Sequence, residues 1–232
     1  MDLEKLRNPY DFANPVSDES LFIGRKDELN EIRYYLDQAR TAARPISIAL
    51  LGQRAAGKTS FLNITEIEAQ RREFCTVRIN LDEGDADSQL LFFHKLLDRI
   101  VFAVCKMGAF GGINGKTYEA YIDIINSYDI PEDKAFCPFL FPLHYARAMS
   151  RGNIQASISD QSVENDLQVI RKELGRTIVL LFDECNVLAN SRIHLQKIRN
   201  IFQSVSGFML VFTGTPDLFP VYLLRKGGSG RN

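Results

Sequence analysis

Residues 46–60, with the sequence ISIALLGQRAAGKTS, decide the fold of this chain. The first six residues, 46–51, are mostly apolar and partly β-branched, which is typical of a strand buried within a sheet. A glycine-bounded loop follows at 52–57, and a helical pattern continues from Lys58 to about Arg71. The stretch therefore predicts a strand, a tight loop and a helix in succession.

The loop and the first helical turn match the pattern G-x-x-x-x-G-K-[ST]. Phosphate oxygens need several donors at short range, and glycines let backbone N–H groups approach, while the N-terminus of the next helix favours an anion. Lys58 can reach the β- and γ-phosphates of a nucleotide, and the Thr59 hydroxyl can ligate Mg²⁺. The alternative is a chance glycine turn, but a strand before it and a helix after it favour phosphate binding. The expected cofactor-binding residues here are Gly52, Gln53, Arg54, Ala55, Ala56, Gly57, Lys58, Thr59 and Ser60.

A second apolar run, IVLLF at 178–182, leads directly into Asp183 and Glu184. Ligands sit at the carboxyl ends of the strands in a parallel sheet, so Asp183 is expected close to Thr59. We assign Asp183 to Mg²⁺, directly or through a water molecule, and Glu184 to polarising the water that attacks the γ-phosphate. The alternative is a strand that ends in solvated acids.

A third apolar run, FMLVF at 208–212, ends at Thr213, with Thr215 two residues later. A hydroxyl at this position could touch the γ-phosphate or position the attacking water. We assign this role to Thr213 and keep Thr215 in reserve. A simple turn out of the strand explains the same residues equally well.

The remaining patterns place these motifs in an α/β domain. Strands are expected at 46–51, 75–80, 177–182 and 208–213, and helices at 27–40, 58–71, 88–107, 116–127, about 139–149, 160–174 and 191–204. Strands that alternate with helices predict a mostly parallel sheet covered on both faces, a three-layer fold. We divide the chain into an extended arm at 1–20, a core at 21–225 with a helical insertion at 84–160, and a flexible tail at 226–232.

Composition narrows the classes of function. The 232 residues are 45% hydrophobic and carry a formal net charge of −1, which argues against disorder and gives nucleic-acid binding no electrostatic support. The four cysteines form no CxxC pair, so neither a dense disulfide framework nor a structural zinc cluster is expected. No run is long enough for a membrane helix, and the first residues lack a signal-peptide pattern. We expect a cytoplasmic protein with no membrane partner.

Together these motifs resemble the P-loop ATPases of the AAA+/STAND group, related to the origin-recognition-like ATPases. The sequence LFIGRKDEL at 21–29 is similar to the "F-h-G-R-x-x-E-L" box of that group, and with the Walker A loop 52–59, the Walker B run 178–184 and the sensor-1-like Thr213 the resemblance spans residues 21–215. It implies the P-loop NTPase fold and ATP and Mg²⁺ as ligands, with Thr59 and Asp183 at the metal. It also implies that Lys58, Glu184 and Thr213 take part in catalysis.

In this group the Gly-Arg box and the arm before it lie against the adenine. The resemblance therefore makes Phe22, Ile23 and Gly24, and with them Tyr10, candidates for the base pocket. Core packing at the start of a helix is an equal alternative for Phe22 and Ile23.

Members of the group continue past sensor 1 into a helical lid, whereas only a short stretch follows Thr215 here, so we expect this chain to lack the lid. The expected function is a nucleotide-dependent switch that binds and hydrolyses ATP and works with other domains or protein subunits. A nucleotide-binding interaction module with negligible turnover is the alternative, and a turnover assay separates the two. A small-molecule kinase would use the same loop, but Asp183-Glu184 and the Gly24-Arg25 box argue against it.

Overall fold

The computed structural model describes residues 14–109 and 160–216. Its strands are β1 (Ile48–Leu51), β2 (Cys75–Asn80), β3 (Ile178–Asp183) and β4 (Phe208–Gly214). Its α-helices are α1 (Lys26–Ala39), α2 (Lys58–Arg71), α3 (Gln89–Lys106), α6 (Asp160–Leu174) and α7 (Arg192–Ser204), and short 3₁₀ helices occupy η2 (Glu19–Leu21), η3 (Glu83–Ala86) and η5 (Cys185–Asn190).

The four described strands form one sheet in the order β1-β4-β3-β2, and all three pairings are parallel. The predicted α/β class with a parallel sheet is therefore confirmed. The order places β4 between β1 and β3, so the expected approach of Asp183 to the loop after β1 crosses one intervening strand. Because parallel strands share one carboxyl edge, the ends of β1, β3 and β4 meet there.

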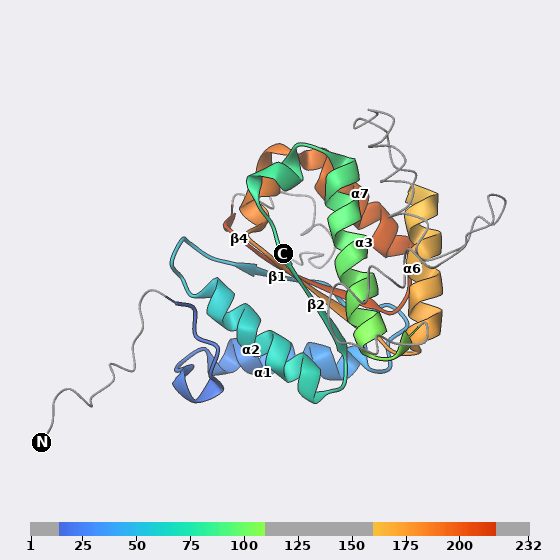
Figure 1. Cartoon of the computed structure of the whole chain (residues 1–232). Coiled ribbons are helices and arrows are strands. Elements are labelled where there is room, and N and C mark those ends of the chain that lie inside the picture. The colour runs from blue at the N-terminus through green and yellow to red at the C-terminus, as the bar shows by residue number, and fades with distance from the viewer. Residues whose placement is uncertain (1–13, 110–159, 217–232) are drawn as a thin grey trace, which may run out of the picture.

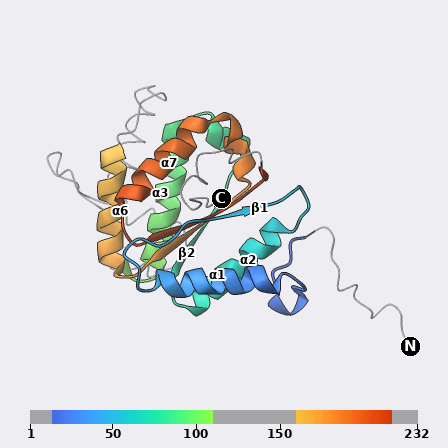
Figure 2. The ribbon, with the colours of Figure 1, turned by 180° about the vertical axis from the view of Figure 1, so that it is seen from behind.

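Helices cover both faces of this sheet, consistent with a three-layer arrangement (Figure 1). The views from front and back agree that α1 and α2 lie on one face and α3, α6 and α7 on the other (Figure 2). The buried residues fall into two clusters that match these layers. One joins Val179, Leu181, Met209 and Val211 of the sheet to α1 and α2. The other joins the alternate residues of the same strands to α3, α6 and α7.

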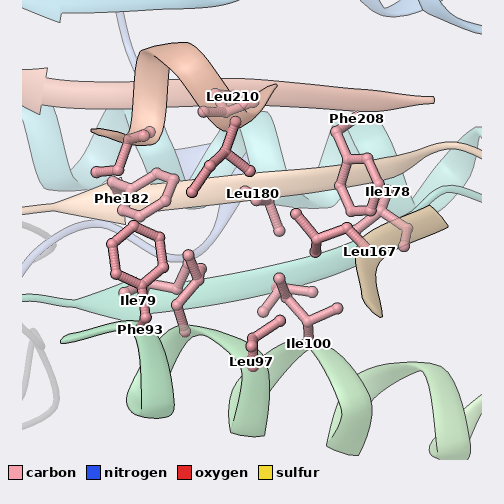
Figure 3. Packing of buried hydrophobic residues seen from close by; sticks show 14 of the residues in the cluster. Ile79, Phe93, Leu97, Ile100, Leu167, Ile178, Leu180, Phe182, Phe208 and Leu210 are labelled. Atoms are coloured by element: carbon pink, nitrogen blue, oxygen red, sulfur yellow. The ribbon is translucent and has the colours of Figure 1, made fainter. Parts of the chain in front are cut away.

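The larger cluster shows why strands β3 and β4 form the centre of the sheet. All residues of both strands are buried, because each strand has a neighbour on both sides and helices on both faces. Figure 3 shows Ile79, Leu180 and Leu210 from three strands packed above Leu97 and Ile100 of α3. The rings of Phe182 and Phe212 stack with their centroids 4.9 Å apart. Apolar burial of this extent is the main term that stabilises the layers.

Most element boundaries lie within one or two residues of the predicted ones. The first strand starts at Ile48 rather than at residue 46, where the Ile46 side chain is 61% exposed. The arm was predicted to be extended, but residues 19–21 form a 3₁₀ turn because the Asp18 carboxylate accepts the Ser20 N–H at 2.9 Å.

The helices expected at 116–127 and 139–149, most of the insertion and the tail at 226–232 lie outside the described residues. In the part of the chain that is described, none of the helices has the length and apolar character to cross a membrane.

Candidate functional site

The loop at 52–57 leaves the end of β1 and turns directly into α2. It begins beside the end of β4, where the Gly52 N–H donates to the Gly214 carbonyl at 3.1 Å. Ala55 and Gly57 have φ angles of +61° and +74°, which lie in the left-handed region. A Cβ at Gly52 would stand 3.3 Å from that of Ala56, so a side chain there would crowd the loop. The loop is thus wound tightly upon itself in front of α2.

The N-terminus of helix α2 has neither a side-chain cap nor an acidic residue to balance its partial positive charge. No side chain caps its first turn, and that turn carries no acidic residue, whereas α1 has Asp27 and Glu28 in the same place. The first N–H groups of a helix carry partial positive charge, and an anion or an acidic side chain normally balances it. The start of α2 therefore has the electrostatic character of an anion-binding end.

The Lys58 side chain lies across this loop. Its ammonium group donates to the carbonyls of Gly52 and Gln53, at 3.0 and 2.8 Å. Both acceptors are neutral and Lys58 carries three donors, so the ammonium group has capacity for an anionic oxygen as well. The charge of Lys58 is therefore held over the loop rather than in open solvent.

Asp183 is the centre of the hydrogen-bond network at the end of β3. Only 5% of the residue is exposed, and one carboxylate oxygen, Oδ1, accepts the Thr213 hydroxyl at 2.6 Å, the Glu184 N–H at 3.1 Å and the Thr59 hydroxyl at 3.4 Å. The predicted proximity of Asp183 to Thr59 is confirmed. Because Thr59 makes the longest of these contacts, it is also the weakest. The two oxygen-bearing side chains assigned to Mg²⁺ thus lie within hydrogen-bond distance of each other.

Glu184 follows in a left-handed conformation, with φ of 56°. Such a conformation costs a residue with a side chain roughly 1–2 kcal/mol. It is held by the Glu184 N–H, which donates to Thr213 Oγ1 at 3.2 Å as well as to Asp183. The residue itself is exposed. The backbone therefore turns the Glu184 carboxylate out of the sheet edge instead of burying it beside Asp183.

Thr213 is buried among protein groups, whereas its predicted role requires the hydroxyl to face a phosphate or a water molecule. It is 1% exposed, and its hydroxyl is engaged by Asp183 and by the Glu184 N–H. It therefore fixes the orientation of both acidic residues. The reserve residue, Thr215, donates from its hydroxyl and its N–H to Asn186 Oδ1, at 3.1 and 2.7 Å.

Arg78 of β2 is a member of the site that the sequence analysis missed. Its guanidinium donates to the other carboxylate oxygen of Asp183 at 2.6 Å, and to Asn63 Oδ1 of α2 at 3.2 Å. Register explains the contact: Asn80 pairs with Asp183, and Arg78 lies two residues before it on the same face of the sheet. A charged residue in the middle of a predicted strand, two positions before its end, was the available signal.

The Gly-Arg box lies beside the loop. The Arg25 guanidinium donates to the Ala56 carbonyl and stands over the Phe61 ring, 6.0 Å from its centroid. Phe22 is half-buried with its ring 5.8 Å from Phe61, whereas Ile23 is 79% exposed and Gly24 has a φ of +89°. Phe22 therefore packs into the core, and Ile23 projects from it. Tyr10 lies outside the described residues.

The arm touches the same helix. The Val16 N–H donates to Ser60 Oγ and the Val16 carbonyl accepts from Asn63 Nδ2, both at 3.0 Å. Ser60, predicted to contact phosphate, is thus bound to the arm, while Arg54 is exposed at the tip of the loop. Asn63 contacts the arm with one end of its amide and Arg78 with the other.

Cys185 lies next to the acidic pair but does not share its chemistry. It is fully buried, its thiol points to the Phe182 carbonyl at 3.7 Å, and burial raises the pKa of the Cys185 thiol. The thiol therefore stays protonated and behaves as a small apolar side chain.

The residues are compatible with Mg²⁺ but do not make a complete protein cage. Mg²⁺ prefers hard oxygen ligands and is commonly held by one or two protein groups with phosphates and water, as a threonine hydroxyl and a carboxylate would allow. Within residues 14–109 and 160–216, no group of three or more His, Cys, Asp or Glu side chains could hold a metal ion. A cation at Thr59 and Asp183 would therefore take its further oxygen ligands from a bound phosphate and water.

A separate groove runs along the outer side of β2, between α2 and α3. It has a volume of about 610 Å³, and its lining includes Phe74, Phe102 and Met107 together with Arg99, Lys106 and Arg176. Glu66 and Arg78 also line it, so the groove reaches the site at the Arg78 side chain.

A scan against models of protein families and a search of curated protein sequences found no match to this chain.

Proposed function

We propose that this chain is an ATP-binding domain of the P-loop type that works as a Mg²⁺-dependent nucleotide switch, similar to AAA+/STAND ATPases. The observation that carries the proposal is the meeting of Thr59, Asp183 and Thr213, which come from three elements far apart in the sequence. Thr59 and Asp183 are 124 residues apart, yet their oxygens lie 3.4 Å apart beside a glycine-bounded loop. A chance glycine turn would not explain why the buried carboxylate of Asp183 lies beside it.

The loop would bind the phosphates in the ground state. Its backbone, the uncapped start of α2 and the Lys58 ammonium group supply N–H donors and positive charge at one place. Thr59 and Asp183 would hold the metal ion, which would supply positive charge against the phosphate oxygens. Arg25 would keep the Gly-Arg box against the loop, and the exposed Ile23 would be the apolar contact for the base.

The residue that follows Asp183 would serve hydrolysis. Glu184 is exposed at the sheet edge and is the candidate general base for an attacking water. Thr213 would keep Asp183 and the Glu184 backbone in place, so its contribution would be to position them rather than to touch phosphate. These roles predict that the acidic pair divides its work: Asp183 serves binding of the metal complex, and Glu184 serves the chemical step.

Calorimetric titration with ATP and Mg²⁺ tests this proposal. Lys58→Ala should abolish measurable binding, Glu184→Gln should leave the dissociation constant unchanged, and Lys26→Ala, at the start of another helix, is the matched control. Binding that survives unchanged in Lys58→Ala would overturn the phosphate role of the loop. Equal loss of binding in Lys58→Ala and Glu184→Gln would overturn the role given to Glu184.

A turnover assay then separates the switch from a nucleotide-binding interaction module. A switch that hydrolyses ATP should release phosphate in single-turnover experiments, and Glu184→Gln should slow that release by at least about a hundredfold. Binding without release, equal in wild type and Glu184→Gln, favours the interaction module.

A further inference from the structure

The carboxylate assigned to the metal already has a cation beside it. Arg78 Nη2 lies 2.6 Å from Asp183 Oδ2, and the two side chains are 20% and 8% exposed. A carboxylate offers about two lone-pair positions on each oxygen; Asp183 Oδ1 accepts three hydrogen bonds that share its two positions, and Oδ2 accepts one. The charge of Asp183 is thus neutralised, and its acceptor positions are nearly filled, by groups of the protein itself.

Arg78 also has another carboxylate within reach. Glu66 of α2 places Oε2 3.8 Å from Arg78 Nη1, and its side chain is 27% exposed. Both residues line the groove along β2, so the Arg78 side chain borders open space. Asn63 Oδ1 accepts from Arg78 Nη1 at 3.2 Å and Asn80 Oδ1 accepts from Arg78 Nε at 3.1 Å. The guanidinium of Arg78 therefore has acceptors on both Asp183 and α2, and Glu66 is a second carboxylate that it can pair with.

We propose that Arg78 is a resident counter-ion of Asp183 that a bound Mg²⁺ must displace, and that Glu66 receives the guanidinium when it leaves. This inference rests on the proposed function, because it concerns the same metal position. While Arg78 contacts Asp183, the carboxylate attracts a divalent cation only weakly. Mg²⁺ therefore strengthens nucleotide binding less than it would if Asp183 had no counter-ion. Movement of Arg78 to Glu66 would couple metal binding to a change on the β2 groove.

Two carboxylates face Arg78, and the arginine lies much closer to Asp183 than to Glu66. Its described charged neighbours are Asp183 at the end of β3 and Glu66 on α2, and the neighbouring amides are neutral. A purely structural ion pair would need only Asp183. The second carboxylate and the open groove are what a displaceable arginine requires.

The test is the metal factor, defined as the dissociation constant of the ATP analogue adenylyl imidodiphosphate in excess EDTA divided by its value in excess Mg²⁺. Calorimetry measures both without any turnover. Arg78→Gln should raise the metal factor by at least about tenfold, because a unit positive charge a few ångströms from the metal is removed. Arg78→Lys keeps the charge and should stay near the wild-type value. Arg99→Gln removes a charge from the same groove and should leave the factor unchanged.

Glu66→Gln tests the second half of the inference in the opposite direction. Without its alternative partner Arg78 stays on Asp183, so the metal factor should fall by several-fold, whereas Glu73→Gln, in the same groove near the other end of β2, should not change it. An unchanged metal factor in Arg78→Gln overturns the inference. If that variant does not fold, Glu66→Gln alone decides, and an unchanged factor there overturns it. Absence of nucleotide binding by the wild type in both buffers would instead overturn the proposed function, and this inference with it.

Discussion

The Thr213 hydroxyl should stabilise the fold and not only the site, and Thr213→Val measures by how much. Valine has nearly the same shape, so the substitution removes a hydrogen bond without opening a cavity in a position that is 1% exposed. The lost bond, 2.6 Å long, goes to a carboxylate, and bonds to charged groups contribute about 1.5–3 kcal/mol. The Glu184 N–H keeps Asp183 Oδ1 as an acceptor at 3.1 Å. We therefore expect the free energy of unfolding to fall by about 2 kcal/mol.

Urea denaturation followed by far-ultraviolet circular dichroism suits this chain, which contains no tryptophan. Thr213→Ser is the control, because it keeps the hydroxyl and loses one methyl group, a cost of about 0.8 kcal/mol. The valine variant should thus be less stable than the serine variant by about 1 kcal/mol, with the same dependence on urea. A valine variant as stable as the wild type would refute the view that Thr213 holds the buried carboxylate.

Three further substitutions test other parts of the structure. Gly207→Ala should lower the melting temperature by more than Gly175→Ala does. Both glycines have positive φ, but a Cβ at Gly207 would clash with the Arg171 side chain, whereas a Cβ at Gly175 would have open space. Equal losses of melting temperature in the two variants would contradict this packing. Asp166→Asn should stabilise at neutral pH, because burial raises the pKa of Asp166 to about 8. The folded wild type keeps a proton on Asp166 that the unfolded chain releases near pH 4. Its free energy of unfolding should therefore fall between about pH 4 and 8 relative to that of the variant. The same dependence of stability on pH in both proteins would contradict this. For Glu68, burial acts to raise the pKa, but Arg33 and Arg72 hold it below its usual value. The stability that these ion pairs add is present above about pH 4.3 and is lost as the pH falls further. Glu68→Gln should therefore lose less free energy of unfolding on acidification than the wild type does. An equal loss in both proteins would exclude a contribution of Glu68 to stability.

The sequence was sufficient for the parts of the fold that depend on local pattern. Helix α2 and strand β2 have the predicted bounds, because an apolar periodicity and a glycine or a turn fix each end. The approach of Asp183 to Thr59 was also predictable, since both follow buried strands that end at one edge of a parallel sheet.

The partners of these residues were not predictable in the same way. Arg78 lies 105 residues before Asp183, and their contact depends on which strands are neighbours and in what register. The same holds for Ser60, whose hydroxyl is bound to the arm through Val16. Strand order comes from the packing of helices on both faces, and no local pattern in the chain specifies it.

Hydrogen exchange of the loop amides tests the central claim most directly, because it reports where a nucleotide binds as well as whether it does. The exchange of residues 53–60 should slow by at least about tenfold when ATP and Mg²⁺ are added, since their N–H groups would donate to phosphate oxygens. Helix α7, on the opposite face of the sheet, should keep its exchange rates. Unchanged exchange in residues 53–60 at saturating ATP and Mg²⁺, or protection confined to the β2 groove, would contradict the account.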